Sequence, residues 1–286
     1  LYDLPMELKY LPIIESALNP VAVSRQGATG LWQFMLGTGK IYGLKNNSLI
    51  DERRDPIKST WAAARYLKDL YAIYQDWNLV LAAYNCGPGT INKAIRRAGG
   101  ATDYWTIYNY LPKETRGYVP AFIAANYIMT YYCEHDICPM ETQLPSATDT
   151  IHIHKDLHLQ QVAEVCNLNI DQLRSLNPQY KKDIIPGNSE LCVLRLPNNT
   201  VSSFIDRQDS IFAHKANEYL KKRKAVAIKD NTGIRTSSKG AVYHKIKSGD
   251  TLGGIAAKYH VSVNQLRRLN NIKGNNIRAG KSLRIR

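Results

Sequence analysis

The chain has 286 residues, of which 44% are hydrophobic, and carries a formal net charge of +14. This length accommodates two or three domains, and the hydrophobic fraction excludes a chain that is disordered over long stretches. No segment approaches the run of about 18 apolar residues that a membrane-spanning helix needs, so none is expected to cross a membrane.

The positive charge is concentrated toward the end of the sequence. Residues 1–150 carry 14 basic and 14 acidic side chains, whereas residues 241–286 carry ten basic and one acidic. A segment this basic either favours an anionic partner, such as nucleic acid, anionic lipid or an acidic wall polymer, or forms a solvated surface. The sequence opens without an initiator Met or a signal-type segment, so we expect a trimmed chain, either a processed product or a cloned fragment, and any export signal or lipid anchor would lie upstream.

Glu15 lies at the end of the first predicted helix. Leu11, Ile13 and Ile14 precede it at positions expected to be buried, and Asn19-Pro20 ends the helix shortly after it. A carboxyl group among apolar neighbours has a raised pKa, because burial disfavours the charged form. Glu15 is therefore either a general acid that works near neutral pH or an ordinary glutamate at a helix end.

The segment GATGLWQFM follows at residues 27–35. Its two glycines allow positive φ angles or the close approach of a ligand. Sugars bind to flat apolar faces beside a few placed amides, so Trp32, Phe34 and Gln33 together suit a carbohydrate groove. Core packing explains Trp32 and Phe34 equally well, but an amide between apolar residues is harder to explain as core.

Apolar residues recur at helical spacing in three further segments, 59–75, 77–84 and 115–132. Ser59 or Thr60 is the predicted start of the first helix, and Gly87-Pro88-Gly89 ends the second in a tight loop. Pro120 falls near the first turn of the third helix. Strand patterns are nearly absent before residue 150, so this part of the chain is predicted to be all-α.

The five cysteines are Cys86, Cys133, Cys138, Cys166 and Cys192. Cys133 and Cys138 are close enough to form a disulfide if the chain turns between them, and Cys166 and Cys192 could form a second bridge. Both bridges are hypotheses that suit an oxidising compartment, and they leave Cys86 as a buried free thiol. No CxxC pair occurs and the histidines complete no zinc pattern, so neither a metal nor a cofactor is expected.

The sequence after residue 150 contains an internal repeat of about 45 residues. The stretch VAEVCNLNIDQLRSLN of the first copy, residues 150–197, aligns with IAAKYHVSVNQLRRLN of the second, residues 241–286. Both copies have the pattern strand, helix, helix, strand, which predicts two small copied modules. The polar segment 198–240 between them is predicted to be a linker with one helix near residues 200–222.

Three ordered motifs over about 105 residues resemble those of one family. They are formed by Glu15-Ser16, Pro20, Ser24, Gly27, residues 30–35, residues 83–89 (AYNCGPG) and residues 114–119 (ETRGYV). Their combination is similar to that of the lytic transglycosylases in the goose-type lysozyme superfamily, especially the membrane-bound type D. One motif alone would not be specific, whereas three in this order are.

The resemblance implies an all-α, lysozyme-like catalytic domain over residues 1–146. Such a domain cleaves the bond between N-acetylmuramic acid and N-acetylglucosamine in peptidoglycan, using Glu15 as the single acid and base and forming 1,6-anhydro ends. The substrate-binding residues implied are Ser24, Gln33, Met35, Tyr84, Asn85 and Tyr118, of which Tyr118 would hold the Glu15 carboxyl. No Asp or Glu lies between residues 16 and 50, and Glu114, the rival carboxylate, is interpreted as structural.

Residues 244–285 resemble a LysM module, a fold that binds N-acetylglucosamine in peptidoglycan and chitin. Asp250 or Thr251 is the predicted cap of its first helix. The glycan-binding residues implied are Gly249, Asp250, Thr251, Leu252, Asn276 and Ile277. The first copy lacks the Gly-Asp-Thr turn and has His154-Lys155-Asp156-Leu157 instead, so its fold is expected while its binding of sugar is in question.

The sequence therefore predicts a multi-domain enzyme, an all-α lysozyme-like domain followed by two small βααβ LysM-type modules. Peptidoglycan is its expected partner. A monomer is expected in the periplasm or cell envelope, held at the outer membrane only through an upstream anchor. Three alternatives are hydrolysis in the same groove, as in goose-type lysozymes, a non-catalytic wall-binding scaffold, and a nucleic-acid binder. The absence of a nucleic-acid motif argues against the last, and the joint presence of Glu15, Gln33, Tyr84 and Tyr118 argues against the scaffold.

Overall fold

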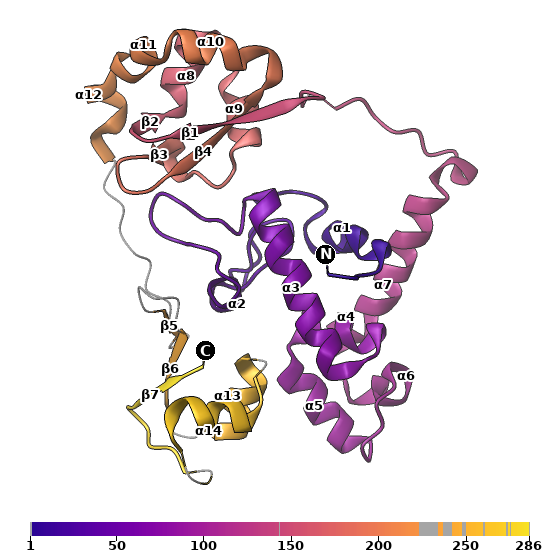
Figure 1. The fold of residues 1–286 in the computed structure, drawn as a ribbon. Helices are drawn as coiled ribbons and strands as arrows, with labels where there is room; N and C mark the ends of the chain where they lie inside the picture. The colour runs from indigo at the N-terminus through magenta and orange to yellow at the C-terminus, as the bar shows by residue number, and fades with distance from the viewer. Residues whose placement is uncertain are drawn as a thin grey trace.

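The computed structural model describes residues 2–142, 144–222, 234–236, 242–247, 250–259, 261–272, 274 and 276–285. Residues 2–142 fold into helices joined by loops, as Figure 1 shows. The α-helices are α1 (Leu11–Ser16), α2 (Leu36–Ile41), α3 (Pro56–Tyr74), α4 (Trp77–Cys86), α5 (Pro88–Arg97), α6 (Tyr104–Ile107) and α7 (Lys113–Thr130). Short 3-10 helices are η1 (Met6–Tyr10), η2 (Tyr108–Tyr110) and η3 (Tyr132–His135). The prediction of an all-α first part is confirmed.

The start of α3 differs from the prediction by three residues. The helix begins at Pro56, because the Asp55 side chain accepts hydrogen bonds from the backbone N–H groups of Ile57 and Lys58. A carboxylate cap followed by proline is a stronger start signal than the Ser59 that the pattern suggested. The predicted tight loop after α4 consists of Gly87 alone. Its φ of 81° turns the chain, and α5 begins at the next residue, Pro88.

Pro120 lies inside α7 rather than in its first turn. A proline has no N–H, so the carbonyl four residues earlier, that of Arg116, loses its helical donor. The hydroxyl of Tyr104, a fully buried residue, donates to this carbonyl at 2.9 Å and to that of Thr115 at 3.3 Å. The Tyr104 hydroxyl thus replaces the missing donor, and α7 continues past Pro120 as one helix.

The first LysM-type module extends from residue 148 to residue 222, and we call it the first module. Its elements are β1 (Thr148–Ile153), β2 (Asp156–His158), α8 (Leu159–Cys166), α9 (Ile170–Leu176), η4 (Lys181–Asp183), β3 (Ile184–Pro186), β4 (Cys192–Pro197), η5 (Asn198–Thr200), α10 (Val201–Asp206), α11 (Gln208–Ala213), α12 (Ala216–Tyr219) and η6 (Leu220–Lys222). β1 pairs with β4 and β2 with β3, both antiparallel.

Residues 198–222 do not form a linker, contrary to the sequence prediction. Phe204, Ile211 and Leu220 are buried in the core of the first module. The Gln161 amide of α8 donates to the carbonyls of Ile211 and His214, which fixes α11 on α8. Three apolar anchors separated by polar residues gave too weak a periodic pattern to distinguish packed helices from a linker.

The last module, residues 234–285, has the predicted strand, helix, helix, strand order with one additional strand. Its elements are β5 (Ile234–Thr236), β6 (Val242–Lys245), α13 (Leu252–Tyr259), α14 (Val263–Asn270) and β7 (Ser282–Arg284), in an antiparallel sheet ordered β5-β6-β7. α13 lies against α5 of the helical part. The predicted order, an all-α domain followed by two small modules of strands and helices, is confirmed.

The loop between α2 and α3 joins the helical part to the first module. Figure 1 shows this loop reaching the end of the module where β3 and β4 lie. Leu49 is fully buried and Ile50 is 4% exposed, and both belong to the hydrophobic core of the first module rather than to that of the helical part. Tyr180 pairs with Ile50 in an antiparallel bridge. The two parts are therefore packed on one another through a shared core.

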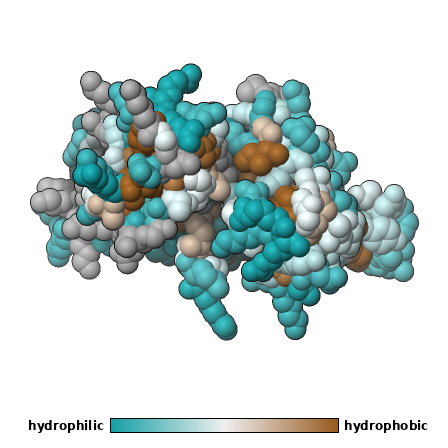
Figure 2. Space-filling view, turned by 90° about the horizontal axis from the view of Figure 1, so that it is seen from below, coloured by the Kyte–Doolittle hydropathy of each residue, from teal (hydrophilic) through white to brown (hydrophobic). Residues whose placement is uncertain are grey.

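The outer surface is largely hydrophilic on the face that Figure 2 shows, with hydrophobic patches that are small and separated. Among the described residues, no helix combines the length and the apolar character that crossing a membrane requires. The exposed apolar side chains are distributed over several elements, for example Trp61 on α3 and Ile123 on α7.

The two predicted disulfides are absent, since all five cysteines are free thiols. Cys166 ends α8 on the side that faces Ser203 of α10, whereas Cys192 begins β4 beside Tyr180, so the two thiols have different neighbours. Cys133 in η3 and Cys138 beyond it are both exposed. Cys86 is also free, and it is half-buried rather than fully buried.

Candidate active site

A cleft of about 600 Å³ opens in the helical part and is lined by α1, α2, α3, α4, α7 and the loop before α2. It contains all seven of the residues predicted for catalysis and substrate binding in this part of the chain, Glu15, Ser24, Gln33, Met35, Tyr84, Asn85 and Tyr118. Gln26, Thr38 and Tyr66 also line it and were not predicted. Tyr66 lies on the buried face of α3, where its spacing indicated only core packing.

Glu15 occupies the last turn of α1, which ends abruptly after it. Ala17 has a φ of 50° and its N–H donates to the carbonyl of Ile13, which closes the helix. The neighbouring Ser16 hydroxyl contacts the carbonyls of Pro12, at 3.1 Å, and Leu31, at 2.9 Å. This contact ties the end of α1 to the loop before α2, and explains the Ser that follows Glu15 in the first motif.

The pKa of the Glu15 carboxyl is raised from 4.5 to about 7. Burial is the largest cause, because an ionised carboxylate loses its hydration there. A hydrogen bond donated by the Tyr118 hydroxyl to Oε1 acts in the opposite direction, and the negative charge of Glu114 raises the pKa further. Glu15 can therefore hold a proton at neutral pH and release it to a bound group, as a general acid must.

Two phenols lie near this carboxyl group, that of buried Tyr118 and that of partly buried Tyr84. Tyr118 of α7 donates to Glu15, and Tyr84 of α4 donates to the carbonyl oxygen of Trp32 at 2.7 Å. Burial raises the pKa of both tyrosines well above 10, so both hydroxyls keep their protons at neutral pH. Tyr118 thus orients the carboxyl as a permanent donor, while Tyr84 holds the loop that carries Trp32, which is a core residue at 6% exposure.

The other predicted contacts are fixed by local hydrogen bonds. The Gln33 amide nitrogen donates to the carbonyls of Gly30, at 2.9 Å, and Ala22, at 3.3 Å, which leaves Oε1 as the group able to accept a bond in the cleft. Ser24 Oγ accepts from the Ala28 N–H at 3.0 Å, so its proton can be donated elsewhere. Asn85 Oδ1 accepts from the Thr115 hydroxyl at 2.9 Å. Met35, 45% exposed, offers an apolar, adaptable surface.

Glu114 is the second carboxylate of the cleft. It lies in the first turn of α7, is exposed and lines the same cavity as Glu15. Its interpretation as a structural residue finds no support in this exposed position, and its charge acts on Glu15 instead. Within the part of the chain that the structure describes, no group of three or more His, Cys, Asp or Glu is arranged to hold a metal ion.

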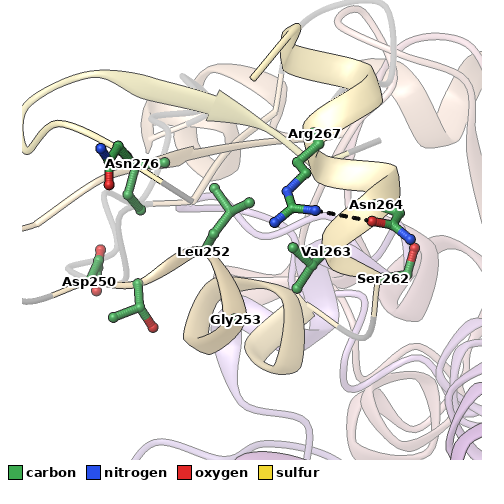
Figure 3. A pocket seen from close by; sticks show the side chains of 10 residues that line it. Asp250, Leu252, Gly253, Ser262, Val263, Asn264, Arg267 and Asn276 are labelled. Carbon is green, nitrogen blue, oxygen red and sulfur yellow. Dashed lines mark hydrogen bonds between the residues drawn. The ribbon is translucent and has the colours of Figure 1, made fainter. Parts of the chain in front are cut away.

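The last module has a cavity of about 820 Å³ between α13, α14 and the segment before β7 (Figure 3). Five of the residues predicted to bind a glycan line it, Asp250, Thr251, Leu252, Asn276 and Ile277, while Gly249 lies outside the described residues. Figure 3 shows Arg267 of α14 reaching toward Asn264, with which it shares a hydrogen bond at 3.4 Å.

Three residues of this predicted glycan site also stabilise the fold of the module. Thr251 Oγ1 accepts from the Gly254 N–H at 3.0 Å and is the residue that caps α13. Asp250 Oδ2 accepts from the Lys247 N–H at 2.7 Å and lies 2.8 Å from Nε2 of buried His244, so it secures the turn. Leu252 is only 1% exposed and therefore packs mainly in the core of the module.

Comparison with known families divides the chain in the same way. Residues 2–107 match the Transglycosylase SLT domain, residues 147–213 the LysM-like domain of lytic transglycosylase MltD, and residues 244–286 the LysM domain. The membrane-bound lytic murein transglycosylase D of Escherichia coli (strain K12) is 31% identical over 287 residues, covering 99% of this chain. The chain spans 60% of the length of that relative.

Two further similarities involve the helical part. The soluble lytic murein transglycosylase of Escherichia coli (strain K12) is 32% identical over 124 residues, which is 41% of this chain and 19% of the relative. The solved structure of the 70 kDa soluble lytic transglycosylase from Escherichia coli matches 46% of this chain and 22% of its own, with 28% identity and a TM-score of 0.39. In the order of its three matched domains and over nearly its whole length, the chain is similar to the membrane-bound lytic murein transglycosylase D, an SLT domain followed by LysM-type domains.

Proposed function

We propose that the protein is a peptidoglycan lytic transglycosylase that cleaves the β-1,4 bond between N-acetylmuramic acid and N-acetylglucosamine. The observation that carries this proposal is Glu15, a carboxyl group that keeps its proton to a pH of about 7 inside a cleft and receives a hydrogen bond from Tyr118. The similarity of the chain to lytic murein transglycosylases supports the same chemistry. The mixed amide, hydroxyl and apolar lining suits a glycan.

In the proposed reaction one carboxyl group serves twice. Glu15 first gives its proton to the glycosidic oxygen, so the bond between this oxygen and the anomeric carbon breaks. The resulting carboxylate then takes the proton of the 6-hydroxyl of the muramic acid, whose oxygen bonds to the anomeric carbon and forms a 1,6-anhydro ring. A well-oriented internal nucleophile has an effective molarity on the order of 10⁵ M or more, so no second carboxylate is needed to activate water.

Hydrolysis is the alternative reaction. Glu114 lies in the same cleft as Glu15 and is the second carboxylate that could activate a water molecule. Mass spectrometry of the products from purified sacculi separates the two reactions. A transglycosylase leaves ends that are lighter than reducing ends by one water. Reducing ends as the sole product would overturn the proposed reaction while leaving a glycan-cleaving function in place.

The reaction rate should depend on pH through Glu15. Only the protonated form can donate, and the protonated fraction falls through a midpoint at pH about 7. We therefore expect kcat/KM on soluble glycan fragments to fall with an apparent pKa of about 7, and about tenfold per pH unit beyond it. Initial rates between pH 5 and 9, with binding followed in parallel, check this. A midpoint near 4.5, the ordinary value, would contradict the environment described for Glu15.

We further propose that the last module docks the enzyme on the wall through the cavity lined by Thr251 and Asn276. Removing residues 241–286 should weaken co-sedimentation with sacculi by about tenfold or more, because a second binding site raises the effective concentration of the first. Cleavage of soluble glycan fragments should change by less than about twofold. The unfolding midpoint of the truncated chain is the control, since α13 lies against α5. Equal losses in both assays would contradict docking.

We place the enzyme in the periplasm or cell envelope, where peptidoglycan is found, and propose that it acts as a monomer. The name of the relative, a membrane-bound transglycosylase, supports a membrane anchor located upstream of the residues in this chain. Fractionation of cells that express the full gene product, followed by high-salt washing, distinguishes such an anchor from adsorption through the basic residues 241–286.

A further inference from the structure

Backbone hydrogen bonds join the first module to the loop between α2 and α3. The Asp51 N–H donates to the Gln179 carbonyl at 2.9 Å, and the Lys181 N–H donates to the Leu49 carbonyl at 2.6 Å. The Lys181 ammonium also reaches the Asn47 carbonyl at 2.8 Å. Together with the burial of Leu49 and Ile50, these bonds hold residues 47–51 against the first module.

The same loop also holds one wall of the active-site cleft, through Arg53. This residue is 8% exposed, and its Nε and Nη2 donate to the two carboxylate oxygens of Asp51 at 2.9 and 2.8 Å. Its Nη1 donates to the carbonyls of Gly27, at 3.0 Å, and Phe34, at 3.1 Å. One guanidinium group therefore clamps both ends of the segment 27–34 that presents Gln33 to the cleft.

The backbone conformation of segment 27–34 depends on contacts from outside the segment. Gln33 has a φ of 44°, in the left-handed region that non-glycine residues rarely adopt. The backbone of Gly30 lies directly against that of Arg53, with no room for a side chain between them. Strained segments of this kind persist only where the surrounding contacts over-determine them, and Arg53 supplies those contacts here.

The first module is covered at a position that lines the open cavity of the last module. By the alignment of the two copies, His158 corresponds to Thr251, which lines the open cavity of the last module. The His158 ring instead stacks on that of Tyr219, with centroids 5.1 Å apart and planes at 22°. α12 and η6 lie against β2. The helices that follow β4 thus cover the position that corresponds to Thr251.

We infer that the first module acts as an intramolecular brace of the cleft instead of a glycan-binding module, and that Asp51 and Arg53 are positioning residues through which it acts on Gln33. The chain of contacts runs from Gln179 and Lys181 to the loop, from Asp51 to Arg53, and from Arg53 to both ends of segment 27–34. The inference rests on the proposed function in that it assigns the held segment to a glycan-cleaving cleft.

The test compares two matched deletions in the core of the first module of the full chain. Ile50→Ala and Ile211→Ala both truncate a buried isoleucine of that core, but only Ile50 lies on the loop that carries Arg53. We expect Ile50→Ala to lower kcat on soluble glycan fragments by about tenfold and to leave KM within about twofold. Ile211→Ala should leave both constants within about twofold. Equal losses in the two variants would overturn the inference.

Asp51→Asn tests the clamp itself, because it keeps the shape of the side chain and removes the charge that pairs with Arg53. It should lower kcat by about tenfold with the same small change of KM. Hydrogen exchange is measured on the same samples at the amides of Thr29, Gln33 and Phe34, which bond within segment 27–34. Their exchange should accelerate in Asp51→Asn and Ile50→Ala and not in Ile211→Ala. Unchanged exchange and unchanged kcat would each refute the brace.

The design separates failure of the inference from failure of the proposed function. A wild-type chain that cleaves no glycan refutes the function, and hydrogen exchange still decides whether the first module steadies segment 27–34. An active wild type with fully active Ile50→Ala refutes the brace alone. Should Asp51→Asn fail to fold, the two isoleucine variants decide the question.

Discussion

Glu15→Gln is expected to lower the turnover of purified sacculi by about 10³-fold or more, because the amide can neither give nor take the proton on which both steps depend. The substitution keeps the size of the side chain and leaves Oε1 to accept the hydrogen bond from Tyr118. The fold and the binding of sacculi should therefore survive. Product release is followed by mass spectrometry, and binding by co-sedimentation.

The difference in stability between Glu15→Gln and the wild type should depend on pH in a defined direction. The folded-state pKa of Glu15, about 7, lies above its ordinary value of 4.5, so the folded protein binds the proton more tightly than the unfolded chain does. The stabilisation is fully present below pH 4.5 and is lost as the pH rises through 7. Glu15→Gln should match the wild type at pH 4 and exceed its free energy of unfolding by about 3 kcal/mol at pH 9.

Glu114→Gln is the matched control, since it removes the other carboxylate of the same cleft. Activity should remain within about tenfold of the wild type if the muramic acid hydroxyl is the nucleophile. The alkaline limb of the pH profile should move to lower pH, because the Glu114 charge raises the pKa of Glu15. A Glu114→Gln variant as inactive as Glu15→Gln would show that two carboxylates are needed, which is the requirement of a hydrolase.

The residues of the cleft could be predicted because each lies in a short motif. Ser24, Gln33, Tyr84 and Asn85 line one cavity with Glu15, and their roles toward a glycan stay predictions. What a motif does not contain is the contact that holds it in place. The Ser16 bond to Leu31 and the Thr115 bond to Asn85 join motif residues to one another, and their spacing alone indicated no such pairing.

Arg53 marks the limit of prediction from this sequence. It is 26 residues from Gly27, whose carbonyl it binds, and it lies in a stretch, DERRD, that is indistinguishable by composition from an exposed charged loop. The carboxylate that pairs with it belongs to Asp51, whose N–H bonds to the Gln179 carbonyl of the first module, more than a hundred residues further along the chain. Long-range pairing also determines the fate of residues 198–222 and of the cysteines, and periodicity carries no information about it.

Gly30→Ala is expected to have the largest effect on stability. Gly30 has a φ of 89°, and a Cβ added there would lie 1.8 Å from the Arg53 carbonyl oxygen and 2.7 Å from its carbonyl carbon. Both atoms are backbone, and the Arg53 guanidinium and the first module hold that backbone in place, so the clash cannot be relieved by rotating a side chain. We expect a loss of more than about 4 kcal/mol in the free energy of unfolding, measured with urea.

Gly27→Ala isolates the part of this effect that comes from close packing. Gly27 has nearly the same φ, 84°, but nothing lies within 4 Å of the place where its Cβ would be. Only the left-handed conformation is then unfavourable, and the expected loss is about 1 kcal/mol. Equal losses at the two positions would mean that segment 27–34 moves freely relative to Arg53. A loss that is larger for Gly30→Ala than for Gly27→Ala by about 3 kcal/mol would show instead that segment 27–34 packs against a rigid Arg53 backbone.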